Sequence, residues 1–196
     1  MHTTRAQHAA AEELVELIAS KVGTNRDIHP ETAIAAAARL AGSLLLRSFD
    51  VPRASCEPGS VLICEAANEE GPLLIQIMAA YLAGSGIDLD EQKLGGRSSS
   101  ATRGEAPRLE FLDTLSLLQD PGLAISARHR LNLVQTAQAA ALAMAFIVKE
   151  CAPEIGAETG FNAAAFGVVE GSKTVPPRAS VPRQLLPSRK SRFKFW

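Results

Sequence analysis

The sequence predicts an all-α protein, a compact bundle of about six helices that continues into an extended, proline-rich basic arm. Every long segment carries apolar residues at the helical period, and none shows sustained alternation. Alanine and leucine dominate the apolar residues, and aromatic residues are few before the arm, which is typical of closely packed helices. We therefore expect one helical domain over residues 1–172, long enough to bury a core without disulfides or a structural metal.

The first two helices are predicted from apolar stripes and end signals. Residues 6–22 place apolar side chains along one face, and Gly23 ends the helix. A second helix begins at Pro30, because proline suits the first helical position, so His29 falls at the N-cap. We expect this helix to run to about Ser48.

Small residues predict close helix packing at two places. Ala38 and Gly42 lie four residues apart on the core face of the second helix. Residues 137–145 form a second, alanine-rich face. We expect neighbouring helices to approach closely at both, because larger side chains would hold them apart.

The segment over residues 61–67 is ambiguous between a short buried strand and a helical turn. Asn68 then suits the N-cap of a helix whose first turn is acidic. Apolar residues recur along one face of this helix, and Gly84 and Gly86 end it.

Residues 87–105 form the longest stretch without periodicity. We interpret their polar, glycine-rich centre first as a flexible surface loop. Arg97 and Arg103, with serines between them, also suit an anion site or a lid. The segment follows no predicted strand and lacks the lysine of a nucleotide-binding loop, so the anion site is the second interpretation.

The remaining helices are predicted from periodicity and proline breaks. A helix is expected over residues 107–118, and the Asp-Pro-Gly run at 120–122 breaks the chain. A long apolar helix follows over residues 123–150, and Pro153 stops it. A shorter helix is expected over residues 154–169.

Residues that can carry chemistry are scattered along the chain. We expect His29 to cap its helix rather than to act as a base or ligand. Glu65 and Glu69 share a face only if residues 61–70 are helical, and the Glu-x-x-His partner of a di-metal helical site is missing. His129 lies in a basic turn of the long helix, expected to be solvated. We therefore expect no metal site and no cofactor.

Cysteine spacing and hydropathy predict a cytoplasmic protein. Cys56, Cys64 and Cys151 form neither a disulfide framework nor a zinc pattern, which suits a reducing compartment. The first residues are interrupted by glutamates and lack the apolar region of a secretory signal. The longest apolar stretch, residues 131–148, contains polar residues and is expected to be a core helix.

The arm, residues 173–196, is distinguished by its charge. It holds seven of the 20 basic residues and none of the 21 acidic ones, so residues 1–172 carry a surplus of about eight negative charges. Its prolines favour an extended backbone. The side chains expected to make contacts are Leu185, Leu186, Arg192, Phe193, Lys194, Phe195 and Trp196.

These features predict a protein that works by association, as a homodimer or with an acidic protein partner, and that docks through its arm. Catalysis is the less favoured interpretation. One alternative is a small-molecule binder or enzyme with an interhelical pocket, lidded by residues 87–105 and using His29, Glu65 or His129. The other alternative is a tether that binds nucleic acid or an anionic membrane through the basic arm.

Overall fold

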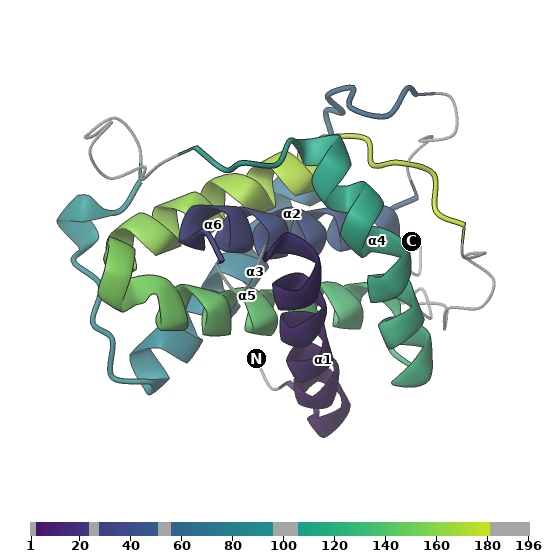
Figure 1. Cartoon of the computed structure of the whole chain (residues 1–196). Helices are drawn as coiled ribbons and strands as arrows, with labels where there is room; N and C mark the ends of the chain where they lie inside the picture. The colour runs from purple at the N-terminus through teal and green to yellow at the C-terminus, as the bar shows by residue number, and fades with distance from the viewer. Residues whose placement is uncertain (1–2, 24–27, 51–55, 96–105, 181–196) are drawn as a thin grey trace, which may run out of the picture.

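The computed structural model describes residues 3–23, 28–50, 56–95 and 106–180. The expected all-α bundle is confirmed, since this part of the chain forms six long helices and no extended strand (Figure 1). The long helices are α1 (Arg5–Val22), α2 (Pro30–Ser48), α3 (Glu65–Gly84), α4 (Phe111–Arg128), α5 (Leu133–Ile155) and α6 (Ala157–Lys173), and the short 3-10 helix η2 (Glu91–Lys93) follows α3.

Helix α2 is the centre of the molecule. Every residue from Pro30 to Leu46 is buried, and α2 contacts each of the other five long helices, most extensively α6 and α5. Figure 1 shows α2 running alongside α6, with α1 crossing in front of the bundle. Alanine and leucine fill most positions on all sides of α2, which is typical of a helix buried on every side. The other helices therefore close around α2.

Helices α2 and α6 pack so closely that glycine is required at their contact. A Cβ atom on Gly42 would lie 2.4 Å from the carbonyl oxygen of Val168, and one on Gly171 would lie 2.4 Å from that of Arg39. Both clashes involve backbone atoms, so neither can be relieved by a rotamer change. The close packing predicted at Ala38 and Gly42 is confirmed, and α6 is the partner helix.

Helices α1 and α2 begin and end within a residue of the predicted positions. Thr4 caps α1 through a reciprocal pair of hydrogen bonds with Gln7. His29 occupies the N-cap of α2 as expected, but its side chain makes no capping hydrogen bond to the backbone. Its ring Nδ1 instead lies 2.9 Å from the Oγ1 atom of Thr32.

The predicted break at residues 120–122 is wrong, because α4 continues through Pro121 to Arg128. A proline removes one helical hydrogen bond, and packing on both sides compensates for that loss. The chain turns only at residues 129–132, where Arg130 adopts a positive φ of 54° and Asn132 caps α5. His129 therefore lies at the C-cap of α4 and not inside a long helix.

The predicted stop at Pro153 is also wrong. Proline lies in the last turn of α5, and the helix ends at Gly156, which has a φ of 87°. Glycine adopts this conformation without the steric cost of a Cβ atom. Helix α6 begins directly afterwards and runs to Lys173, four residues past the predicted end.

The ambiguous segment at residues 61–67 divides between the two interpretations. Val61 forms an isolated antiparallel bridge with Thr174, whereas α3 begins at Glu65 with Cys64 at its N-cap. The N-cap predicted at Asn68 is therefore wrong, since Asn68 lies in the first turns of α3. The extended conformation at Val61 depends on its pairing with Thr174, and the sequence of residues 61–67 alone does not indicate this pairing.

One ion pair joins α2 to α6 in the interior. Arg39 is 6% exposed, and its Nε atom donates to Glu170 over 2.6 Å. The same guanidinium donates through Nη1 to the carbonyl oxygen of Leu109 over 2.6 Å and to the hydroxyl of Thr114 over 3.2 Å. This network ties three segments together at one buried cation.

Within the described ranges, no single helix has the length and hydropathy needed to cross a membrane. Helices α4 and α5 pass that test only when taken together, and they are bent by 113° relative to each other.

Candidate functional site

The chain that follows α6 lies on the helical body as far as it is described. Gly59 and Val175 are joined by a 2.8 Å hydrogen bond from the Gly59 amide to the Val175 carbonyl. Val175 is buried. This contact fixes the direction in which the basic arm leaves α6.

Side chains of α2 and α4 hold the next residues of the arm. The carbonyl oxygen of Pro177 accepts a 2.5 Å hydrogen bond from Arg47 and a 3.1 Å hydrogen bond from the side-chain amide of Gln119. The amide of Ser180 donates to the carboxylate of Asp120, at 3.1 and 3.2 Å from its two oxygens. The arm is therefore anchored at the middle of α4 when its described part ends.

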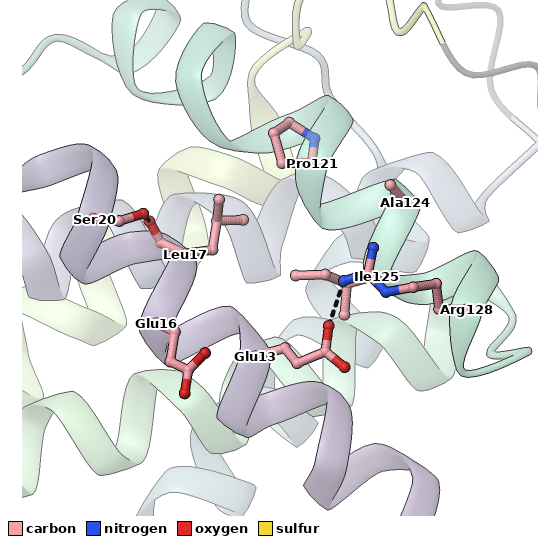
Figure 2. Close-up of a pocket in the computed structure, with 8 residues that line it drawn as sticks. All are labelled: Glu13, Glu16, Leu17, Ser20, Pro121, Ala124, Ile125 and Arg128. Atoms are coloured by element: carbon pink, nitrogen blue, oxygen red, sulfur yellow. Dashed lines mark hydrogen bonds and ion pairs between the residues drawn. The ribbon is translucent and has the colours of Figure 1, made fainter.

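A groove of about 520 Å³ lies between α1 and α4, beside this anchor (Figure 2). Each helix contributes four side chains at the same i, i+3, i+4, i+7 spacing, which places them on one helical face. The lining residues are Glu13, Glu16, Leu17 and Ser20 of α1 and Pro121, Ala124, Ile125 and Arg128 of α4. The groove thus combines an apolar centre with carboxylates along one helix.

Charged groups close one end of this groove. The Arg128 guanidinium binds the Glu13 carboxylate across it, as Figure 2 shows, and the Nε2 atom of His129 lies 2.7 Å from the other oxygen of Glu13. The hydrogen bond from Arg128, and then that from His129, lower the pKa of Glu13 below its usual value. Stability from this contact is present at neutral pH and is lost as the pH falls through that lowered pKa.

Glu16 lies on the same helical face and is exposed. Among the described residues it makes no hydrogen bond or ion pair, and Figure 2 shows its carboxylate apart from the bridge between Glu13 and Arg128. The groove therefore retains one carboxylate that its own side chains do not engage.

The residues expected to share a pocket do not form one site. His29 begins α2 and lies beside Glu31, with 3.6 Å between the ring Nε2 and a carboxylate oxygen. Glu65 begins α3 and is exposed. His129 ends α4 and binds Glu13 of α1.

The other predicted contact residues lie outside the described part of the chain. These are the anion-site arginines Arg97 and Arg103 and the docking residues of the arm, Leu185, Leu186, Arg192, Phe193, Lys194, Phe195 and Trp196. Within the described ranges, no group of three or more His, Cys, Asp or Glu side chains is arranged to hold a metal ion.

The environment of Cys151 is unfavourable to the thiolate. Burial, and then the carboxylates of Glu154, Glu31 and Glu150, raise the pKa of its thiol to about 11. The thiol therefore stays protonated at neutral pH and is a weak nucleophile.

We expect Cys151 to be alkylated slowly in a variant that retains only this cysteine, Cys56→Ser with Cys64→Ala. At about pH 8 iodoacetamide should react about tenfold more slowly with the folded than with the denatured protein, because less thiolate is present. The rate should keep rising up to about pH 10. A rate that levels off near the pKa of an ordinary thiol would contradict this prediction.

Sequence reasoning missed a set of large apolar side chains that remain exposed on α6 and on the segment that is bridged to the residue after it. Phe166 and Val169 of α6 are 68% and 51% exposed, and Val61 and Ile63 are 79% and 97% exposed. Phe166 and Val169 lie three residues apart, a spacing that places them on one face. The helical period could have revealed this exposure, because Ala164 and Val168 fill the buried face of α6 and Phe166 and Val169 lie outside it.

Compared with known proteins, the chain matches no family model, no curated protein and no solved structure.

Proposed function

We propose that the protein works by association with another protein chain, in the first place a second copy of itself, with the basic arm as a docking element. The observation that carries this proposal is the exposure of large apolar side chains around α6. Exposed apolar groups that gather in one region are typical of interaction surfaces. The free cysteines suit the reducing cytoplasm, where we propose that the association occurs.

The local geometry supports a single surface made of two segments. The bridge between Val61 and Thr174 places the segment before α3 beside the end of α6. In an extended segment, residues two apart point the same way, so Val61 and Ile63 share a side while Leu62 packs against the core. Val169 lies only about 6 Å before the end of α6, at 1.5 Å per residue.

Burial of this surface supplies the favourable free energy of association. Removing a large apolar side chain from water is worth about 1.5–3 kcal/mol, before the entropy of association is subtracted. Four such side chains are enough for a weak or moderate dimer. The arm adds cations and aromatic residues, which suit the acidic surface of the helical body.

The test is the double variant Ile63→Ser/Phe166→Ser. We expect it to weaken self-association at least tenfold, since two exposed anchors are lost and about 1.4 kcal/mol corresponds to tenfold. Sedimentation equilibrium over a range of concentrations measures this change. Circular dichroism should show an unchanged fold, because both side chains are largely exposed.

The matched control is Leu117→Ser, which removes an exposed apolar side chain from α4 instead. It should leave the dissociation constant unchanged. A wild-type protein that is monomeric even at about 1 mM, where an association of about 4 kcal/mol is detectable, would contradict the homodimer. Equal effects of the control and the double variant would contradict the chosen surface.

A further inference from the structure

We propose that residues 183–187 of the arm dock into the groove between α1 and α4 of the same molecule, so that the aromatic end of the arm extends beyond it. This inference rests on the proposed function only in treating the arm as a docking segment. It assigns the acidic groove lined by Glu13, Glu16 and Leu17 to a specific occupant, the chain's own proximal arm.

The point where the described chain ends places the arm beside the groove. The amide of Ser180 is bound to Asp120, and the next residue of α4, Pro121, lines the groove. Neighbouring residues lie about 100° apart on a helix about 10–12 Å wide, so the path around α4 is about 10 Å. About three extended residues cover this distance. Residues 181–183 can therefore cross α4, and the following residues reach the groove.

The length of the groove matches the segment that follows. Its lining on α4 extends from Pro121 to Arg128, about 10 Å along the helix axis. Three or four residues of extended chain span that length, which corresponds to residues 184–187. Leu186 then faces the apolar centre formed by Leu17 and Ile125, and Leu185, its neighbour in an extended segment, points to the opposite side.

The charges of arm and groove are complementary. Residues 181–196 contain five basic and no acidic residues. Glu16 is the groove carboxylate that no described side chain engages, and Arg183 enters the groove on the path from Ser180. The hollow between α3 and α5 is a poorer match, since its lining of Thr3, Leu73, Gln76, Ile77, Ala80, Tyr81 and Leu142 carries no charge.

Docking within one molecule is favoured because the arm is already tethered. A short flexible tether gives an effective concentration in the millimolar range, so even weak contacts keep a segment bound. The anchors at Pro177 and Ser180 shorten the free tether further. The aromatic residues at positions 193–196 then remain available for a partner chain.

The experiment uses the full chain with one relocated fluorescent probe. Trp196 is the chain's single tryptophan, so Trp196→Phe combined with Leu186→Trp moves the probe to the proposed docking segment. We expect a blue-shifted emission and protection from acrylamide, a neutral quencher, in dilute lipid-free buffer. The protection should be independent of protein concentration and should fall at high salt.

Two groove variants and one matched control test the location. In the same probe background, Glu16→Lys should weaken docking about three- to tenfold, as expected for reversing one exposed charge facing a cation. Ser20→Arg should release the probe by filling the groove and adding a like charge. Glu12→Lys makes the same charge change on an exposed residue of α1 that does not line the groove, and it should leave the probe protected.

Each other outcome would overturn the inference. A probe that is fully exposed, or that shifts only when anionic vesicles or DNA are added, would show that the groove does not hold the arm. Equal release by Glu16→Lys and Glu12→Lys would show a diffuse charge effect. Protection that disappears on dilution would assign the groove to the arm of a second copy.

The same variants distinguish this inference from the proposed self-association. Ile63→Ser/Phe166→Ser should change the sedimentation behaviour but not the protection of the probe. Glu16→Lys should change the protection but leave the apolar surface around α6 intact. Either proposal can therefore fail while the other stands.

Discussion

The Gly42→Ile variant is expected to lose at least about 3 kcal/mol of its free energy of unfolding, the upper end of the range for overpacked cores. A Cβ atom at this position would lie 2.4 Å from the carbonyl oxygen of Val168 and 2.7 Å from the amide nitrogen of Ser172. Both are backbone atoms of α6, so the helix itself must move away. Because small domains are stable by only about 5–15 kcal/mol, much of the variant should be unfolded on mild heating.

The control for this prediction is a glycine-to-alanine pair. Gly42→Ala should destabilise through the same clash, whereas Gly71→Ala in α3 meets no atom within 4 Å and should gain about 0.5–1 kcal/mol from helix propensity. Urea denaturation followed by circular dichroism measures both. If the two variants shift stability in the same direction, the close contact between α2 and α6 is not as described.

The second large effect is expected at the buried ion pair, where Glu170→Ala should cost about 3–5 kcal/mol. This change leaves the Arg39 guanidinium buried, and among the described residues only the neutral oxygens of Leu109 and Thr114 remain to accept its hydrogen bonds. An unpaired buried charge is destabilising because it has lost its water without gaining a counter-charge. The side chain of Glu170 itself is 26% exposed, so it tolerates the loss of its partner better.

Because Arg39 is more deeply buried than Glu170, removing one partner should cost more stability than removing the other. Arg39→Met removes the buried charge and retains much of the volume, so it should cost less than Glu170→Ala. Glu150→Ala breaks the exposed contact with Lys149 and should change stability by less than about 1 kcal/mol. The free energies of unfolding from denaturant titrations rank the three variants. A Glu170→Ala variant as stable as Glu150→Ala would show that the pair is solvated.

The sequence predicts the helices of this protein well because each one carries a sustained apolar period. The helix boundaries predicted wrongly are those where a proline and a sustained apolar period indicate different ends. Pro121 and Pro153 do not end their helices, since each proline costs a helix only one hydrogen bond where packing holds the chain in place. The capping pair of Asn132 with Gln135 and the positive φ of Gly156 fix the true ends.

The candidate site was less predictable for a different reason. A groove depends on which helices lie side by side, and nothing in the sequence of α1 indicates that its face at Glu13 and Glu16 meets α4. The link between His129 and Glu13 spans more than a hundred residues. Local patterns do report single faces, which is why the small-residue contact at Gly42 was found. The docking residues of the arm lie outside the described part of the chain, and their role stays a prediction.

The central position of α2 has a consequence for protein synthesis. The ribosome produces α2 well before α5 and α6, the two helices that cover it most extensively. The apolar faces of residues 30–46 therefore stay unprotected until the chain has grown past residue 173. Nascent chains with exposed apolar segments are prone to aggregation and are bound by chaperones. Folding of the helical body is therefore completed only after α6 has been synthesised and cannot proceed helix by helix.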